Sequence, residues 1–367
     1  LQRRGAHMGR VVADDAFPDY TDSVMVTAAN PAYRGGPLRR FFFGRQHRDA
    51  WAAPVAAPYL DLGRTAGGLT PLKRGGGQQT LSLRLRGGDG REYVLRSIDK
   101  DPSGTVPVPL QGSVATDIVQ DGISSLHPYG AFVVPRLADA AGVFHTNPRL
   151  VYVPDDPRLG IYRTTFGGRL MMFEERPDDD MSDLPGYGGA REVVSATKLY
   201  EEVDGDNDHR VDQHAFERAR LFDVLLADWD RHRDQWRWAA FEPFELDATL
   251  TGEARTAGKV YRPVPRDRDA AFNQMNGFFP SLLPYLIKKF QDFDASYGNL
   301  AGLTMNGLEQ DRRFTNALTR DEWVAVAEDL QARLTDEVVE EALRGWPDSV
   351  YDLEGARTAA VFAARRA

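Results

Sequence analysis

The pattern of apolar residues changes near residue 176, and this change limits the possible folds more than any other feature. Over residues 67–100, apolar and polar residues alternate between glycine-rich turns, which predicts a β-meander. After residue 190, apolar residues recur mainly at helical spacing, and Asp212 is a helix N-cap signal. The stretch 176–190, rich in Asp, Pro and Gly, is typical of a linker. This order predicts an α+β fold with a β-rich first part and a helical second part.

Further elements follow from local signals. A helix is expected at 113–126, because His127-Pro128 would stop it. Residues 130–175 read as strands and turns, with Phe132-Val133-Val134 and Leu150–Val153 as short apolar runs. A hairpin leaves through Trp236 and Trp238 and returns through Val260 and Tyr261, and Thr319 with Glu322 predicts a capping box.

The chain divides into three predicted segments. Residues 1–50 hold a cloning scar, Gly5-Ala6-His7-Met8, and an extended leader that packs on the body through Phe41-Phe42-Phe43. Residues 51–185 form the β-rich unit, and residues 186–367 form the helical unit.

Composition excludes several classes of function. The net charge of −9 argues against nucleic acid as a partner. With no Cys, the chain has no disulfide, thiolate metal site or cysteine nucleophile. No stretch approaches the roughly 18 apolar residues of a membrane span.

The densest chemistry lies in Asp228-Trp229-Asp230-Arg231-His232-Arg233-Asp234-Gln235, directly after an apolar helix. Phosphoryl transfer needs a carboxylate beside the attacking hydroxyl and an oxygen ligand for the metal about one loop-turn later. Asp230 and Gln235 have this spacing, and Arg231 with His232 would brace the loop. The alternative is an ordinary helix end with solvated charges.

A second motif, Asp267-Arg268-Asp269, follows the predicted strand 259–264. Two carboxylates two residues apart after a strand can face one divalent cation, and oxygen ligands suit Mg²⁺ or Mn²⁺. The alternative is a surface turn with an internal Arg–Asp pair.

Two weaker motifs concern phosphate binding. The backbone amides of Gly75, Gly76 and Gly77 would cover phosphates, although a plain glycine hairpin has the same sequence. Arg96 or Lys100, at the end of the return strand, would clamp phosphates with a carboxylate from the next helix, Asp121 or less favourably Asp117. The alternative is a charge cluster at a strand end.

In this order, the motifs resemble those of atypical kinases. The run from Phe222 to His232 is similar to the catalytic-loop signature of secretory-pathway Golgi casein kinases and HipA-type kinases, and Asp230 matches their catalytic Asp. Gln235 falls where those families carry Asn or Glu. The run 267–272 resembles their metal-binding segment and the paired Asp of CotH spore-coat kinases. Arg96 and Lys100 lie where the families carry the phosphate-clamping Lys.

Residues 41–238 also resemble an uncharacterised region of bacterial surface proteins, where it accompanies a calcineurin-like phosphatase domain and an outer-membrane surface-antigen barrel. Neither partner domain is present in this chain. This resemblance and the absence of Cys favour a periplasmic or cell-envelope location and an association with an outer-membrane barrel.

The resemblance implies a bilobal, protein-kinase-like fold that binds ATP with Mg²⁺ or Mn²⁺ and transfers the γ-phosphoryl group to a hydroxyl of a protein, sugar or lipid headgroup. Asp230, supported by His232, would be the catalytic base. Gln235 and Asp267 would bind metal, and Asp269 would be a second ligand or a support. A pseudokinase or binding module is one alternative, and a nucleotidyltransferase on the same fold is the other.

Overall fold

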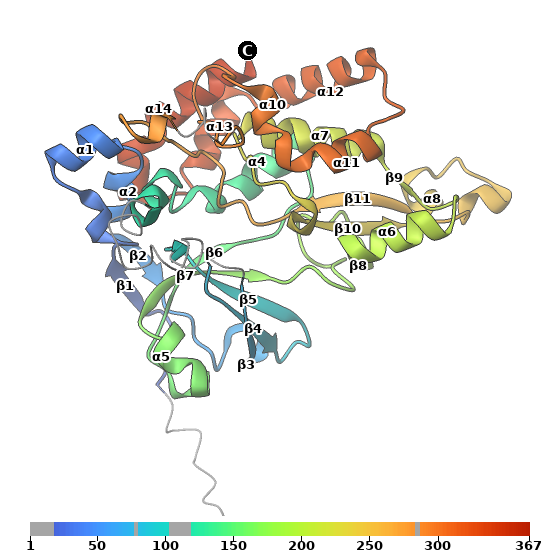
Figure 1. The fold of residues 1–367 in the computed structure, drawn as a ribbon. Helices are drawn as coiled ribbons and strands as arrows, with labels where there is room; N and C mark the ends of the chain where they lie inside the picture. The colour runs from blue at the N-terminus through green and yellow to red at the C-terminus, as the bar shows by residue number, and fades with distance from the viewer. Residues whose placement is uncertain (1–17, 77–79, 103–118, 283–286) are drawn as a thin grey trace, which may run out of the picture.

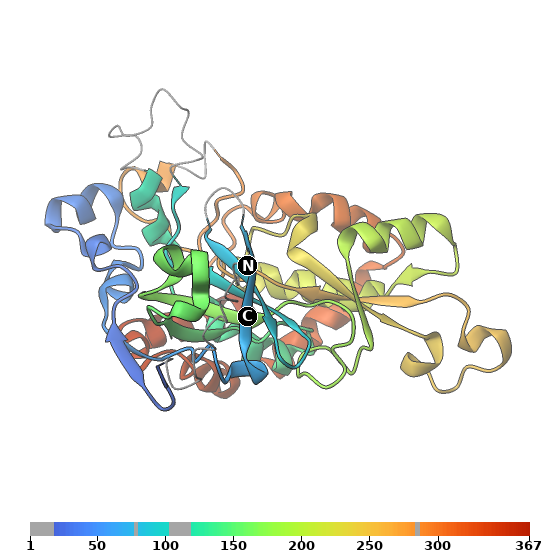
Figure 2. The same cartoon turned by 90° about the horizontal axis from the view of Figure 1, so that it is seen from below.

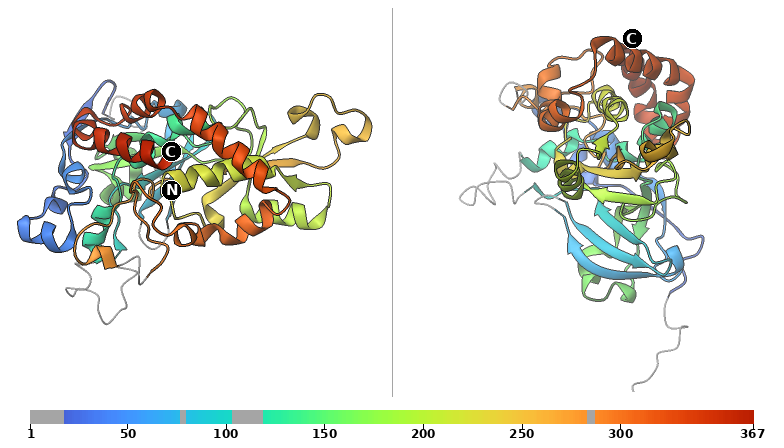
Figure 3. Two further views of the ribbon diagram at one scale, coloured as in Figure 1. Left: turned by 90° about the horizontal axis from the view of Figure 1, so that it is seen from above. Right: turned by 90° about the vertical axis from the view of Figure 1, so that its right-hand side faces the viewer.

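The computed structural model describes residues 18–76, 80–102, 119–282 and 287–367. The fold is α+β, as predicted. A five-stranded sheet and a four-stranded sheet follow one another along the chain, and helices cover the second sheet (Figure 1). In Figure 3, the C-terminal helices lie at one end of the molecule and the five-stranded sheet lies at the opposite end.

The first sheet is antiparallel and has the order β3-β4-β5-β7-β6. The meander is confirmed over its first three strands. Alternation places Leu83, Leu85 and Leu95 on one buried face, where they pack with Phe173. The strands are β3 (Leu69–Gly75), β4 (Ser82–Gly87), β5 (Glu92–Ser97), β6 (Arg149–Val153) and β7 (Arg169–Glu175).

The second sheet contains the predicted hairpin and has the order β8-β10-β11-β9. Trp236 lies opposite Pro265 in the antiparallel β10–β11 pair. Trp236 and Trp238 are fully buried and pack against Phe216 of the preceding helix. The strands are β8 (Glu192–Ser195), β9 (Arg210–Val211), β10 (Trp236–Phe241) and β11 (Val260–Pro265).

The helices of the second half begin at the predicted caps. The Ala215 N–H donates to the Asp212 carboxylate at 3.0 Å, and Thr319 with Glu322 forms the capping box. Among the described residues, no helix combines the length and apolar character needed to cross a bilayer. The helices are α6 (Ala196–Gly205), α7 (Gln213–Leu225), α8 (Pro243–Leu246), α10 (Leu300–Leu303), α11 (Leu308–Phe314), α12 (Arg320–Arg333), α13 (Asp336–Leu343) and α14 (Asp348–Arg366).

One local prediction differs from the structure, and a second is confirmed in part. The run Phe132-Val133-Val134 is not a strand, because it leads into helix α4 (Val134–Ala141), whose buried residues 134, 137, 138 and 141 follow helical spacing. Of the helix expected at 113–126, residues 113–118 lie outside the described residues. Residues 119–122 are helical, and Ile123–Ser125 is a short 3-10 turn. A second short helix, α5 (Arg163–Phe166), precedes β7.

The leader holds more secondary structure than predicted. It contains β1 (Val24–Thr27), which pairs with β2 (Val55–Pro58), and the short helices α1 (Pro37–Phe43) and α2 (Arg48–Ala52). Arg48 and Trp51 are buried and attach it to the body. Of the predicted docking run, Phe42 and Phe43 pack against Phe279, whereas Phe41 is 69% exposed.

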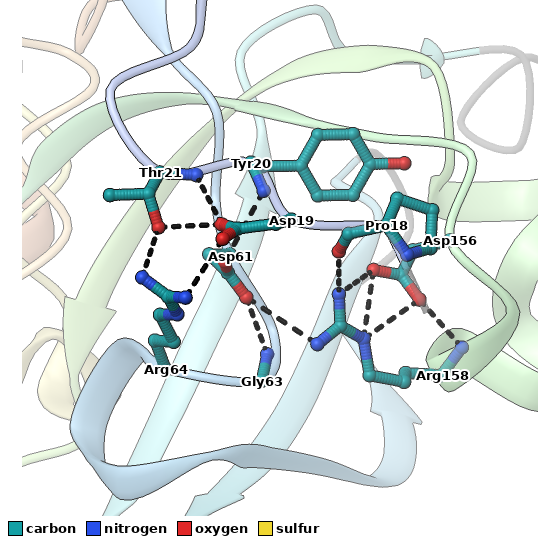
Figure 4. A network of polar contacts seen from close by, with 9 residues as sticks. All are labelled: Pro18, Asp19, Tyr20, Thr21, Asp61, Gly63, Arg64, Asp156 and Arg158. Carbon is teal, nitrogen blue, oxygen red and sulfur yellow. Dashed lines mark hydrogen bonds and ion pairs between the residues drawn. The ribbon is translucent and has the colours of Figure 1, made fainter. Parts of the chain in front are cut away.

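A polar network fixes the start of the leader (Figure 4). The Arg158 guanidinium lies 2.7 Å from the buried Asp156 carboxylate and 3.4 Å from Asp61, and it also donates to the Pro18 carbonyl at 3.0 Å. The Arg64 guanidinium lies 2.8 Å from the Asp19 carboxylate. The leader is therefore tied to the segment before β3 and to the turn after β6.

A buried histidine joins the leader to the C-terminal helix. His127 stacks on Trp346 at 4.3 Å between ring centroids, and its Nδ1 accepts from the Tyr129 N–H at 3.1 Å. Its Nε2 lies 3.8 Å from the Glu354 carboxylate, which also contacts His47. Burial, and then the neighbouring His47, lower the pKa of His127 to about 3.

This pKa predicts acid sensitivity. Between about pH 3 and 6.5 the unfolded chain binds a proton at His127 that the folded chain does not, so stability falls as pH falls below 6.5. We expect this group alone to remove about 2 kcal/mol of unfolding free energy between pH 7.5 and 5. Urea titrations of wild type and His127→Phe should therefore diverge by that amount. The control is His214→Phe, at a side chain 54% exposed. If the unfolding free energies of His127→Phe and wild type fell equally between pH 7.5 and 5, the prediction would be contradicted.

Candidate active site

The loop after α7 carries Asp230 at the edge of the second sheet. Ala227 adopts a left-handed backbone (φ 55°), which turns the chain out of the helix. The Asp230 carboxylate accepts a hydrogen bond from Asn306 Nδ2 at 3.0 Å, and its side chain is 33% exposed. His232 Nε2 lies 4.0 Å from the same carboxylate. Asp230 is thus held in place and remains accessible to a substrate.

Arg231 holds this loop in place through buried polar contacts. Its fully buried guanidinium lies 2.6 Å from the Asp228 carboxylate and donates to the backbone carbonyls of Arg266 and Asp267 at 2.8 and 2.9 Å. Arg268 also binds Asp228, at 3.0 Å. One buried guanidinium therefore links the Asp230 loop to the segment after β11, as expected for a residue that braces the loop.

The second motif holds two carboxylates that interact electrostatically. Asp267 has a left-handed backbone (φ 60°), and its charge acts on the Asp269 carboxyl. Burial, and then the Asp267 charge, raise the pKa of Asp269 to about 7. Burial alone would raise the pKa of Asp267, but Arg96 holds it well below its ordinary value. The titrations of the two carboxyls are thus coupled, because the charge of one changes the pKa of the other.

The two cations predicted at the end of the return strand meet these carboxylates. Arg96 lies 2.9 Å from Asp267 and 3.1 Å from Glu174 on β7, and Lys100 Nζ lies 2.7 Å from Asp269. Burial opposes the charge of Lys100, but Asp269 and Asp267 raise its pKa, and Asp230 adds to this shift. Arg96 and Lys100 therefore both lie at the site. The prediction named one or the other as the residue that clamps phosphates, and the two choices are compatible.

Two oxygens of the site are buried without a hydrogen-bond donor. Gln235 Oε1 and Asp269 Oδ1 accept no hydrogen bond in the part of the chain that the structure describes. Gln235 is 7% exposed, its Nε2 lies 3.3 Å from His232 Nε2, and its backbone carbonyl accepts from the Arg266 N–H at 3.0 Å. Unpartnered carboxylate and amide oxygens are the donor set that fits a hard divalent cation.

Asp121 is not the partner of the clamp. Its two carboxylate oxygens bind Arg48, at 2.8 and 2.5 Å, and Arg39 lies 2.7 Å away. Both arginines belong to the leader. They occupy the carboxylate that was expected to pair with Arg96 or Lys100. Asp117 lies outside the described residues.

The predicted phosphate-covering glycines lie at the β3–β4 turn. Gly75 pairs with Ser82 at the end of β3, and Gly76 has a φ of 102°. A Cβ at Gly76 would lie 2.1 Å from the Thr80 carbonyl oxygen, so the tight turn itself accounts for this glycine. Gly77 lies outside the described residues, and a role in nucleotide binding stays a prediction.

Several residues of the site escaped sequence reasoning. Glu174 was detectable as an acid directly after the apolar run 170–173, whereas no local signal marks Asn306. Arg237 lies on β10 and Arg266 directly follows β11, and the buried Nε atom of each has no hydrogen-bond partner among the described residues. Burial, and then Arg266, lower the pKa of Arg237 to about 10. These two arginines add positive charge beside Asp267 and Glu174, whose carboxylates act on Arg266.

No protein-family model matches the chain, and no curated protein matches it significantly. Two solved structures are similar at a distance. The proinflammatory kinase CtkA of Helicobacter pylori is 10% identical, with a TM-score of 0.36 over 81% of this chain and 95% of that chain. HipA of a Shewanella oneidensis MR-1 toxin–antitoxin system, solved with HipB and operator DNA, is 14% identical, with a TM-score of 0.36 over 81% of this chain and 65% of that chain. Both likenesses are distant, so any function has to follow from this chain's own residues.

Proposed function

We propose that the chain is an ATP-dependent phosphotransferase with a bilobal, kinase-like fold, in which residues 51–185 and 186–367 are the two lobes. One observation carries the proposal. Lys100 and Arg96, from the first sheet, contact Asp269 and Asp267, from the second sheet, close enough to Asp230 for its charge to act on Lys100. A proton acceptor, two carboxylates and two cations thus meet between the sheets, which is the set that phosphoryl transfer requires.

Gln235, Asp267 and Asp269 would hold the divalent cation, Mg²⁺ or Mn²⁺. The two unpartnered oxygens, on Gln235 and Asp269, support this assignment. A cation bound there supplies neutralisation of the phosphate charge. Arg231 acts as a positioning residue, because it holds the backbone at Asp267 through two carbonyls.

Asp230 would accept the proton of the attacking hydroxyl. Asn306 holds one of its oxygens by a hydrogen bond and so orients the carboxylate. His232, which is half-exposed, lies beside both Asp230 and Gln235 and would support the loop. Arg96 and Lys100, now paired with aspartates, would hold the nucleotide phosphates.

A small pocket with mainly apolar walls lies beside Lys100 and Asp269. It is lined by Trp51, Ile98, Leu126, Phe132 and Met172, among others. We include a location in the bacterial cell envelope and a hydroxyl acceptor on a protein, sugar or lipid headgroup in the proposal. The location rests on the sequence resemblance and the absence of Cys, and the acceptor rests on the resemblance alone.

Metal-dependent nucleotide binding tests the proposal. We expect ATP with Mg²⁺ or Mn²⁺ to stabilise the protein, by about 2.7 kcal/mol at a ligand concentration of 100 times Kd, and ATP alone to stabilise it much less. Asp267→Asn should lose the metal-dependent part, whereas Asp183→Asn, at a carboxylate 62% exposed, should keep it. Thermal unfolding with each ligand combination measures this. An unchanged metal-dependent shift in Asp267→Asn would remove Asp267 from the metal site.

Gln235 decides how well the site works with Mg²⁺. Its side chain is one methylene longer than Asn, and Mg²⁺ demands nearly ideal octahedral geometry, so we expect slow turnover and a preference for Mn²⁺. Gln235→Asn should keep or improve turnover with Mg²⁺, and Gln235→Ala should lose metal affinity. Isothermal titration with Mn²⁺ and turnover with each metal measure both effects. If neither substitution changes either quantity, Gln235 is only a loop residue.

A further inference from the structure

Large apolar side chains gather on one exposed surface, formed by the leader and the segment around Phe278. Leu38 and Phe41 on α1 are 72% and 69% exposed, and Phe278 and Phe279 are 59% and 46% exposed. Phe42 joins the two groups, because its ring lies 5.1 Å from Phe41 and 5.8 Å from Phe279 between centroids. We call Leu38, Phe41, Phe278 and Phe279 the apolar patch. Contiguous exposed apolar surface of this kind usually marks an interaction site.

The apolar patch is built from two segments that are held together by the backbone. The Phe279 N–H donates to the Phe42 carbonyl at 2.9 Å, and the Gln46 N–H donates to Asn276 Oδ1 at 3.0 Å. Gly44 has a φ of 84°, and a Cβ there would lie 1.7 Å from the Asn276 carbonyl oxygen. The close approach of the two segments therefore needs this glycine, and the apolar side chains project from a fixed base.

A groove beside the apolar patch is lined by arginines. Arg34, Arg40 and Arg45 border it together with Phe41 and backbone around Gly277. Arg40 is paired with Asp49 at 2.6 Å, whereas no carboxylate of the described residues forms an ion pair with Arg34 or Arg45. The whole chain carries a net charge of −9. The groove is therefore a local excess of positive charge on an acidic protein.

The shape of this region suits a flat partner better than a protein ligand. Figures 1 and 2 both show α1 at the outer edge of the molecule, where it projects from the body. Leu38 and Phe41 are three residues apart and share one face of α1. Projecting apolar side chains next to arginines are what an anionic lipid surface accepts, because the apolar groups enter the interface and the guanidinium groups reach the phosphates.

We propose that the apolar patch and the arginine groove dock the protein on a lipid bilayer that carries anionic headgroups. Leu38, Phe41, Phe278 and Phe279 enter the interfacial layer. Arg34 and Arg45 contact headgroup phosphates, and each contributes through attraction to the surface potential. This inference does not depend on the proposed phosphotransferase activity.

Vesicle co-sedimentation of the full chain tests the inference. We expect binding to vesicles of phosphatidylcholine with phosphatidylglycerol, little binding to phosphatidylcholine alone, and a loss of binding as salt rises. Phe41→Asp combined with Phe278→Asp should weaken binding about tenfold or more. The matched control is Leu353→Asp, at an apolar side chain 52% exposed on α14, which should bind as wild type does.

A second pair of variants tests the charge. Arg34→Glu with Arg45→Glu should weaken binding to anionic vesicles about tenfold or more, and Arg344→Glu, at a side chain 64% exposed, should not. Circular dichroism confirms that each variant is folded. Absence of binding to anionic vesicles overturns the inference, as does equal binding by the variants. If soluble glycerol phosphate bound the arginine groove as tightly as anionic vesicles do, the groove would be a site for free phosphate instead. Dimerisation lost in Phe41→Asp would show that the apolar patch joins two copies of the chain.

Discussion

Asp230→Ala is expected to abolish phosphoryl transfer while the protein stays folded and still binds nucleotide. Removing a positioned proton acceptor costs roughly 10²–10⁴-fold in rate. The side chain is one-third exposed and outside the buried ion pairs, so its loss should cost little stability. Turnover, melting temperature and nucleotide affinity of the same preparation separate these effects.

The control for this prediction lies in the same loop. Asp234→Ala removes an exposed carboxylate four residues away and should leave turnover near that of wild type. Asp230→Asn keeps a similar shape and should be as inactive as Asp230→Ala, because an amide cannot take the proton. Full activity of either Asp230 variant would end the assignment of Asp230 as the base.

The second large effect is expected at Arg231. Arg231→Met leaves Asp228 buried with one cation fewer and frees the two backbone carbonyls that Arg231 holds. Removing one partner of a buried ion pair typically costs about 3–5 kcal/mol. Arg268 also binds Asp228, so we expect a loss of about 3 kcal/mol. Urea unfolding at neutral pH measures it.

A second substitution separates the ion pair from simple packing. Asp228→Asn in the Arg231→Met background should restore part of the lost stability, because it removes the uncompensated charge. Arg233→Met, which removes only a cation–π contact with Tyr200, should cost about 1 kcal/mol or less. A loss below about 1 kcal/mol in Arg231→Met would contradict the role of Arg231 as the residue that joins the two segments.

Local patterns predicted the elements whose signals are local. The β3–β5 meander, the Asp212 cap and the β10–β11 hairpin all depend on alternation, turn residues or caps within a few positions. The prediction of a strand at Phe132-Val133-Val134 was wrong, because three apolar residues do not distinguish a strand from the start of a buried helix. The helices of the leader were not predicted, because burial of residues such as Arg48 against distant parts of the chain stabilises them.

The candidate site shows the same division. Asp230, Gln235, Asp267 and Asp269 were identifiable because each lies where a predicted helix or strand ends, next to other chemistry-bearing residues. The assignment of Asp121 was wrong because its partners, Arg48 and Arg39, are more than 70 residues away in the sequence. No spacing rule encodes such a contact. Asn306, 76 residues from Asp230, escaped prediction for the same reason.

Transfer of label from ATP tests the central claim most directly. The protein, alone and with a bacterial envelope fraction, is incubated with ATP labelled in the γ- or the α-phosphoryl group, with Mg²⁺ or Mn²⁺ present. The proposed function predicts covalent transfer of the γ label that disappears in Asp230→Ala. Transfer of the α label would instead show a nucleotidyltransferase, and transfer of neither would show a binding module. Either of these two results would contradict phosphotransferase activity.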